Sequence, residues 1–297
     1  MNAVEPLETY DPAQWVQLRK QANMVGFALL AYFGFLLFAA TGIGYLTATL
    51  VAIVGLLAWK KTRYFSNVIL QKGKPMCGGD FLALLSLAMA PQLVGQLCDV
   101  GLQCLLESWG MDGFELQKMN LSRADAMTMV LYVGIAAPIA EELLFRGLLL
   151  RALAQYNKKL AIFASSLLFG LFHSSLTQLP YAFLLGLVLG YVALEYHIIW
   201  AVIMHLFNNL VFAVLLPQIL AFLPTRVADW IMWACMTGFF LAAVLVIIAR
   251  NEQVRDKWRE ERVQLWQKKD FFRAPIVIAL MGLCLLNLIA TTYIMLS

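Results

Sequence analysis

Charged side chains are scarce in this sequence. Asp, Glu, Lys and Arg make up 13% of its 297 residues, while apolar residues make up 62%. Soluble domains average about 25% charged residues and roughly 45–50% apolar residues. The shortage of charge therefore argues against a soluble fold and predicts a chain that lies largely in lipid.

Three other features are missing. None of the five cysteines belongs to a Cys-x-x-Cys pair, so the sequence predicts neither a disulfide framework nor a thiolate zinc site. The basic residues are not interleaved with aromatic residues in a cluster, which argues against a nucleic-acid partner. Residues 1–22 lack a short apolar core followed by small residues, so we expect a polar cytoplasmic leader and no cleaved secretory signal.

Long apolar runs, by contrast, are abundant. A helix needs roughly 20 mostly apolar residues to cross a hydrocarbon core about 30 Å thick, and the backbone must bond to itself there. Nine runs meet this pattern, which predicts an all-α, polytopic membrane protein. The expected spans are 24–40, 43–59, 81–106, 126–153, 160–176, 181–196, 198–220, 230–249 and 275–296.

The basic residues indicate how these spans are oriented. If the N-terminus is cytoplasmic and the spans alternate, all 22 Lys and Arg residues fall on the cytoplasmic side except Lys118, Arg123 and Arg226. Cytoplasmic loops of membrane proteins are enriched in Lys and Arg, so this asymmetry supports nine spans. The charged segment 250–273 is expected to be an interfacial amphipathic helix or a solvated loop.

One predicted helix carries two carboxylates in an apolar run. A charge near the bilayer centre costs at least about 2.5–3.5 kcal/mol, so each one needs a partner, a water-filled cavity or a function. Glu142 and Arg146 are four residues apart and share a helix face, whereas Glu141 points away from them. We therefore expect Glu142 to pair with Arg146 in a structural role and Glu141 to be reactive.

Two later helices add polar groups at a similar depth. His173 lies on the fifth predicted helix, and His205 and Asn209 lie four residues apart on the seventh. Such side chains can activate a water and stabilise an oxyanion, although each alone is more often a packed residue that bonds between helices. His197, at the boundary of two spans, is expected to be interfacial and non-catalytic.

Seven residues on the fourth, fifth and seventh predicted helices form an ordered set of motifs. They are Glu141-Glu142-x-x-x-Arg146, Phe169-x-x-x-His173 and His205-x-x-x-Asn209. Over residues 126–215 this set resembles the signature motifs of the CPBP family of CAAX proteases and bacteriocin-processing enzymes. The family includes the Ras-converting CAAX endopeptidase of eukaryotes and bacterial relatives linked to bacteriocin self-immunity.

The resemblance implies an intramembrane endopeptidase with a four-helix catalytic core at 126–216. Residues 23–125 would be accessory helices, and 217–297 would be C-terminal helices. Glu141 and His173 would activate water, while His205 and Asn209 would donate to the oxyanion. Phe169 would support the site, and Arg146 would hold Glu142 or, alternatively, bind the C-terminal carboxylate of a substrate.

The resemblance leaves the cofactor open between two alternatives. We favour no metal, because no helix carries the His-Glu-x-x-His pattern in which a separate Glu is the base. The metalloprotease alternative is Zn²⁺ held by Glu141, His173 and His205.

The expected partners are membrane lipids and a membrane-associated peptide or protein, with a prenylated CAAX-like chain as one possibility; no oligomeric state is predicted. The site is expected to face the cytoplasm, in the plasma membrane of a prokaryote or the endoplasmic reticulum of a eukaryote. Two other classes stay open, namely an inactive scaffold or bacteriocin-immunity protein and a secondary transporter. A transporter would be marked by inverted repeats with broken helices, and the sequence shows no such repeat.

Overall fold

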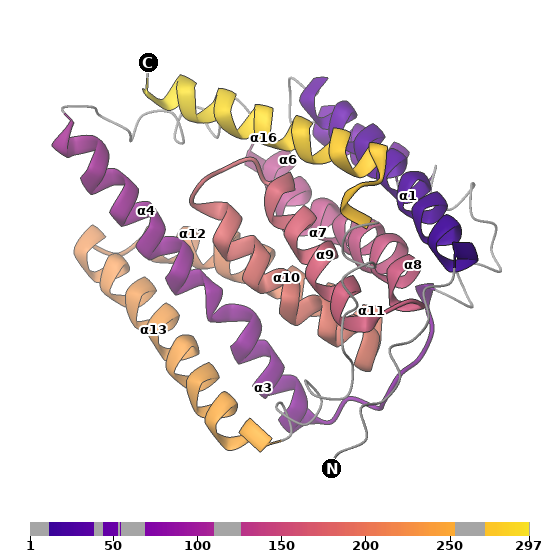
Figure 1. Cartoon of the computed structure of the whole chain (residues 1–297). Coiled ribbons are helices and arrows are strands. Elements are labelled where there is room, and N and C mark those ends of the chain that lie inside the picture. The colour runs from indigo at the N-terminus through magenta and orange to yellow at the C-terminus, as the bar shows by residue number, and fades with distance from the viewer. Residues whose placement is uncertain are drawn as a thin grey trace, which may run out of the picture.

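A computed structural model of the chain describes residues 12–38, 44–52, 54, 69–109, 126–252 and 271–296. These residues form helices and no strand, which confirms the predicted all-α fold (Figure 1). Five described helices are long and apolar enough to cross a membrane. They are Gly78–Ser108, Gln178–Glu195, Ile198–Leu220, Thr225–Ala249 and Pro275–Tyr293. The protein is therefore a multi-pass membrane protein, while the count of nine spans stays a prediction.

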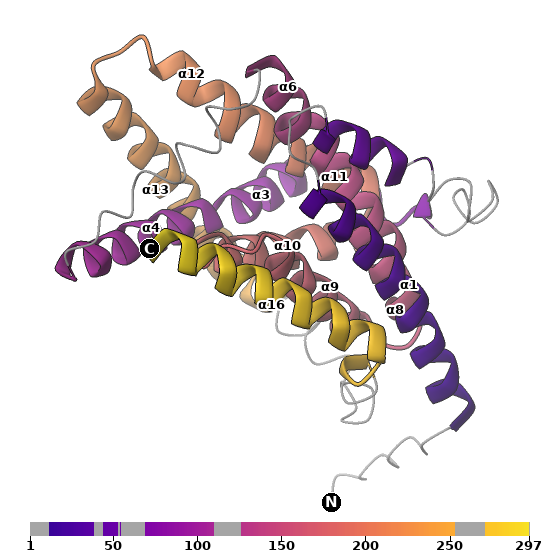
Figure 2. The same ribbon diagram turned by 90° about the horizontal axis from the view of Figure 1, so that it is seen from above.

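The first and last helices of the described chain pack together. Helix α1 (Pro12–Phe38) lies beside α16 (Pro275–Leu296) on one side of the molecule (Figures 1 and 2). Because α1 begins at Pro12, the second half of the predicted leader is helical and continuous with the first predicted span. Residues 44–52 are helical as well, whereas the predicted break at Thr41-Gly42 falls outside the described residues.

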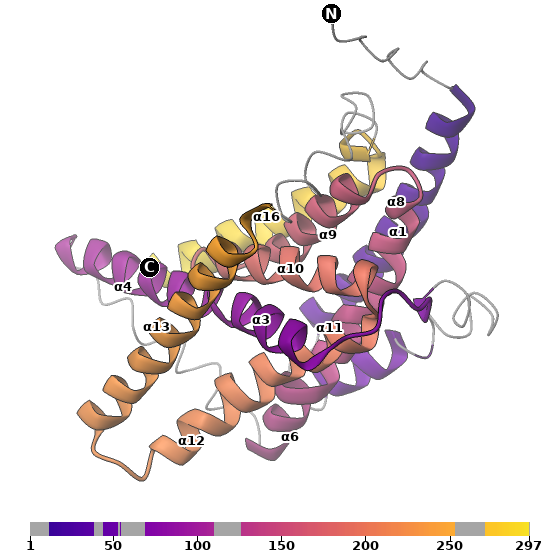
Figure 3. The same cartoon turned by 90° about the horizontal axis from the view of Figure 1, so that it is seen from below.

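The third predicted span consists of two helices in sequence. Helix α3 (Gly78–Met89) begins where the Cys77 sulfur accepts the Asp80 N–H at 3.4 Å, and α4 (Pro91–Ser108) follows after Ala90. Pro91 has no N–H to donate, so the regular helix is interrupted there. Helix α13 (Thr225–Ala249) packs against both and crosses them in the view of Figure 3.

The fourth predicted helix is one helical run from Ala126 to Ala154 with two π-helical stretches. Its segments are α6 (Ala126–Leu131), η2 (Tyr132–Ala136), α7 (Ala137–Glu141), η3 (Glu142–Leu150) and α8 (Arg151–Ala154). π-Helical turns are rare and occur frequently at functional sites. Here the change from α to π winding falls between the two adjacent carboxylates, Glu141 and Glu142.

Helices α9 (Lys158–Phe172) and α10 (Gln178–Glu195) form the most closely packed pair of the core. A Cβ atom at Gly186 would lie only 3.0 Å from Cα of Ser166. Small residues at such positions let two membrane helices approach closely. Close packing therefore holds α9 and α10 in a fixed relative position beside the site.

The end of α9 differs from the prediction. The span was expected to reach residue 176, but α9 ends at Phe172. The N–H groups of His173 and Ser174 bond back to Gly170 and Leu171 at 3.3 and 3.1 Å. Ser174 then takes a left-handed conformation with φ 50°, which turns the chain away from the helix axis. His173 is consequently at the helix end and not within the helix.

The seventh and ninth spans have the predicted limits. The seventh contains α11 (Ile198–Leu206), η4 (Phe207–Leu215) and α12 (Leu216–Leu220). His197 caps α11, because its Nδ1 accepts the Ile199 N–H at 3.2 Å and its Nε2 lies 3.0 Å from the Leu70 carbonyl. Helix α13 begins five residues before the predicted 230, and most of segment 250–273 falls outside the described residues.

Candidate active site

Glu142 lies at the centre of a buried charged cluster. Its Oε1 is 2.9 Å from Arg146 Nη1, which is the pairing that the four-residue spacing predicts, and 2.8 Å from His205 Nδ1. The side chains of Glu142 and Arg146 are fully buried. A carboxylate oxygen only accepts hydrogen bonds, so His205 carries a hydrogen on Nδ1. Glu142 thus fixes both the position and the tautomer of His205.

Phe169 supports this cluster from α9. The Arg146 guanidinium carbon lies 4.3 Å from the centre of the Phe169 ring, a cation–π arrangement, and Arg146 Nη2 donates to the Gly186 carbonyl at 3.4 Å. The same ring makes edge contacts with His173 and His205, at centroid distances of 4.8 and 5.6 Å. The Phe169 ring therefore contacts both imidazoles and the Arg146 guanidinium.

Glu141 occupies a more open position than Glu142. Its side chain is 11% exposed, and it accepts no hydrogen bond from the described residues. Its Oε2 lies 3.7 Å from His205 Nε2, which is too long for a direct hydrogen bond. Glu141 is therefore a carboxylate whose acceptor sites are not used by the described residues.

His173 has one ring nitrogen that makes no hydrogen bond to any described residue. Its Nδ1 lies 2.8 Å from the Phe169 carbonyl oxygen, which can only accept, so the hydrogen of a neutral imidazole is on Nδ1. The lone pair of Nε2 remains available. The Phe169 ring contacts both His173 and His205, and His205 Nε2 lies 3.7 Å from Glu141 Oε2. The structure thus brings the three predicted residues to one region.

Asn209 belongs to a second polar cluster. Its Nδ2 donates to the Val133 carbonyl at 3.1 Å, and its Oδ1 accepts from Asn208 Nδ2 at 2.8 Å. A carboxamide has two N–H bonds, so one N–H of Asn209 stays available to a ligand. The helix from 198 to 220 thus carries His205 and Asn209 one turn apart, as the spacing predicts.

Sequence reasoning missed three members of this second cluster. Gln92 Nε2 donates to Asn208 Oδ1 at 2.7 Å, and Tyr181 OH contacts both the Asn208 and the Gln92 amide nitrogens. Asn208 is adjacent to a motif residue, and Gln92 is a polar residue in an apolar run directly after Pro91. These were the available signals, whereas nothing in the sequence distinguishes Tyr181 from other aromatic residues of membrane helices.

The side chains do not fit the zinc alternative. Among the described residues, no three His, Cys, Asp or Glu side chains gather as the ligands of one metal ion. Glu141 and His205 approach each other, but among the described residues His173 does not complete a three-ligand set with them. The metalloprotease prediction is therefore not supported by this geometry.

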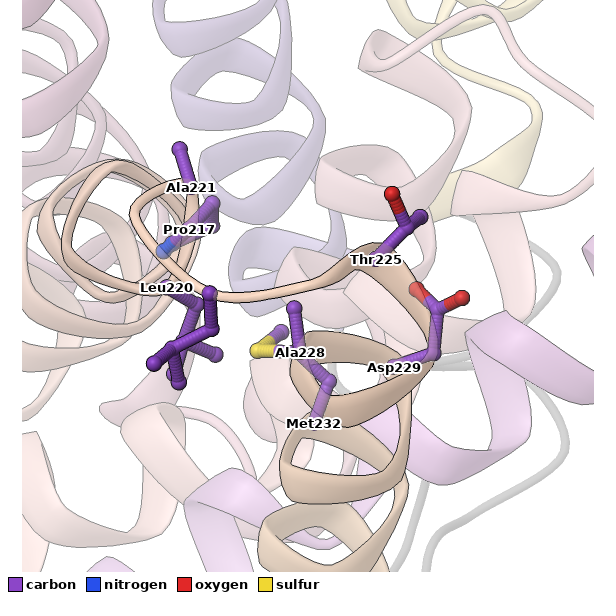
Figure 4. A pocket seen from close by; sticks show the side chains of 8 residues that line it. Pro217, Leu220, Ala221, Thr225, Ala228, Asp229 and Met232 are labelled. Carbon is purple, nitrogen blue, oxygen red and sulfur yellow. The ribbon is translucent and has the colours of Figure 1, made fainter.

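A pocket in the described chain lies elsewhere, at the turn between α12 and α13 (Figure 4). Asp229 and Thr225 contribute polar groups to it, and Met232 and other apolar side chains line the rest. None of the predicted site residues lines this pocket.

Comparison with known proteins identifies the segment that contains the site. No curated protein and no solved structure gives a significant match to the chain. Residues 123–211, however, match the family model described as Rce1-like, type II CAAX prenyl endopeptidase. This range includes all seven motif residues and nearly coincides with 126–215. The chain therefore carries an Rce1-like domain at residues 123–211, which supports the resemblance to CAAX proteases.

Proposed function

We propose that this protein is an intramembrane endopeptidase in which Glu141 activates the water that attacks a peptide bond. The observation that carries the proposal is the different environment of two adjacent carboxylates. Glu142 is neutralised and bonded by Arg146 and His205, while Glu141 keeps free acceptor sites 3.7 Å from an imidazole nitrogen. A carboxylate that accepts no hydrogen bond from the described residues in a largely apolar region is suited to general base catalysis.

In this proposal a water lies between Glu141 and His173 Nε2. Glu141 removes one proton of the water as its oxygen attacks the scissile carbonyl carbon, and His173 holds the second O–H. When the C–N bond of the tetrahedral intermediate breaks, Glu141 returns the proton to the leaving amine. Every proton is thereby accounted for, and no metal takes part in any step.

The oxyanion is stabilised by His205 and Asn209. Because Nδ1–H of His205 already donates to Glu142, His205 donates from Nε2 only as the doubly protonated imidazolium. Asn209 donates with the N–H that Val133 does not accept. Both donors are held by other residues before substrate binds, and such preorganisation accounts for a large share of rate acceleration in hydrolases.

We propose a membrane-associated peptide or protein as the substrate, with a lipidated C-terminal segment as the variant to test first. The family indicates a peptide or protein substrate, and the distribution of Lys and Arg supports a site that opens to the cytoplasm.

The proposal is tested with the full chain reconstituted in liposomes. Quenched fluorescent peptides that end in a CAAX sequence, with and without a prenyl group, report hydrolysis. We expect cleavage by the wild type and at least a ~10²-fold lower kcat for Glu141→Gln, the loss typical of removing a general base. Asp229→Asn, in the pocket remote from the site, serves as the matched control and keeps wild-type activity.

Three results would contradict the proposal. Equal activity of Glu141→Gln and wild type would favour a scaffold, an immunity protein or a transporter. Absence of cleavage of any peptide by the wild type would do the same. Stoichiometric zinc in the purified protein, with activity lost on chelation and restored by Zn²⁺, would replace the metal-free mechanism.

A further inference from the structure

The hydrogen bonds around Asn208 run in a direction that the contacts themselves determine. The Val133 carbonyl can only accept, so the Asn209 atom facing it must be the amide nitrogen. Asn209 Oδ1 then faces Asn208, which must donate with its own nitrogen. The oxygen of Asn208 is left facing Gln92, so Gln92 must also donate. Each amide orientation follows from its neighbour, beginning at an atom that has only one possible role.

Tyr181 receives the remaining bonds of this network. Its hydroxyl oxygen lies against Asn208 Nδ2 and 3.4 Å from Gln92 Nε2, and both nitrogens are donors in the orientation just derived. A hydroxyl has two acceptor lone pairs and one hydrogen. With both lone pairs occupied, the O–H of Tyr181 is left to donate, and no described residue accepts it.

The position of Tyr181 places this donor beside the proposed oxyanion donors. Asn208 Nδ2 contacts both Tyr181 OH and Asn209 Oδ1, so the hydroxyl and the Asn209 amide share a neighbour. A hydroxyl that accepts two hydrogen bonds is polarised and becomes a stronger donor.

We propose that Tyr181 is a third donor to the tetrahedral intermediate and that Gln92 and Asn208 are positioning residues that orient its O–H. This inference rests on the proposed endopeptidase function and deepens it. It also gives the accessory part of the chain a role in the site, because Gln92 belongs to α4, outside the Rce1-like domain. The alternative is that the hydroxyl only ties α4, α10 and η4 together, as polar groups often do between membrane helices.

The test compares Tyr181→Phe, which removes only the hydroxyl, with Tyr293→Phe, an exposed position on α16. We expect Tyr181→Phe to lower kcat by about 10²-fold, in the range seen when one oxyanion donor is lost, with little change in KM. Tyr293→Phe keeps wild-type kinetics. Gln92→Leu lowers kcat as well, and by a smaller factor in the Tyr181→Phe background than in wild type, because it acts in part through that hydroxyl.

A second measurement separates catalysis from structure. A peptide phosphonate mimics the tetrahedral intermediate, so its affinity should fall in Tyr181→Phe by about the same factor as kcat/KM, while the affinity for the product peptide stays unchanged. Parallel loss of both affinities would assign Tyr181 a structural role and overturn the inference. Wild-type kcat in Tyr181→Phe, with Glu141→Gln inactive, would overturn it and leave the endopeptidase intact. Absence of hydrolysis by the wild type would end both proposals.

Discussion

Glu142 is fully buried between Arg146 and His205, whereas Glu141, one residue earlier, keeps an 11% exposed side chain and accepts no hydrogen bond from the described residues. Both carboxylates belong to one helix, and the change from α7 to η3 falls between them. The Glu142 carboxylate is therefore engaged in contacts within the fold, whereas the Glu141 carboxylate is hydrogen-bonded by none of the described residues.

We expect the two carboxylates to have different roles, Glu142 in stability and Glu141 in catalysis. A buried carboxylate with a cationic partner and a hydrogen-bonding imidazole fixes the surrounding side chains, and removing either partner leaves an uncompensated charge. A largely buried carboxylate without hydrogen bonds adds no stabilising contact to the fold, so replacing it by a neutral amide should not lower stability. Substitutions around Glu142 should thus mainly lower the free energy of unfolding. Substitutions around Glu141 should mainly lower kcat.

The largest expected effect is on the Glu142 side. Arg146→Met leaves Glu142 as a buried charge without its cation, and breaking a buried pair in this way costs about 3–5 kcal/mol of stability. The free energy of unfolding in mixed detergent micelles measures this loss. The double variant Glu142→Gln/Arg146→Met should be more stable than Arg146→Met alone. If it is equally unstable, the loss comes from the missing contact with Phe169 and not from the charge.

The second largest effect is expected on the rate, at His173 near Glu141. His173→Gln removes the Nε2 lone pair, so kcat should fall by about 10²-fold while the unfolding free energy changes little. Peptide hydrolysis in liposomes measures the rate. His197→Gln is the matched control, because His197 caps α11 away from the site. A loss of activity of similar size in both variants would argue against a specific role for His173.

A smaller effect is expected at the contact between α16 and the turn after His173. Thr291 Oγ1 lies 2.9 Å from the Ser174 carbonyl and also 2.9 and 3.0 Å from the Asn287 and Leu288 carbonyls of its own helix. Among the described residues, Thr292 Oγ1 bonds only within the helix, to Leu288 at 2.7 Å. Thr291→Val should lower stability by about 0.5–1.5 kcal/mol, the typical net contribution of one hydrogen bond, and lower the rate severalfold.

Thr292→Val has the same change in shape and is the control for this contact. Equal effects of the two variants would show that the contact does not hold the His173 turn.

Part of this arrangement could be read from the sequence, for identifiable reasons. The limits 198–220 and 275–296 follow from the length of apolar runs, because a helix in lipid must satisfy its own backbone. The pairing of Glu142 with Arg146 follows from helical spacing alone. Those features depend on local sequence, and the structure confirms them.

The remainder depends on contacts between distant segments. The contacts of Gln92 and Tyr181 with Asn208 join residues 116 and 27 positions apart, and no local pattern indicates them. The early end of α9 depends on the left-handed Ser174, a residue type that rarely adopts that conformation. The π-helical stretches likewise give no periodic signal in an apolar run.

The most direct test of this account is a paired measurement on Glu141→Gln and Glu142→Gln, purified side by side, with kcat and unfolding free energy determined for both. The account predicts that Glu141→Gln loses hydrolysis at near wild-type stability, while Glu142→Gln is clearly destabilised. Equal losses of rate and stability in the two variants, or the reverse pattern, would contradict the division of roles between the two carboxylates.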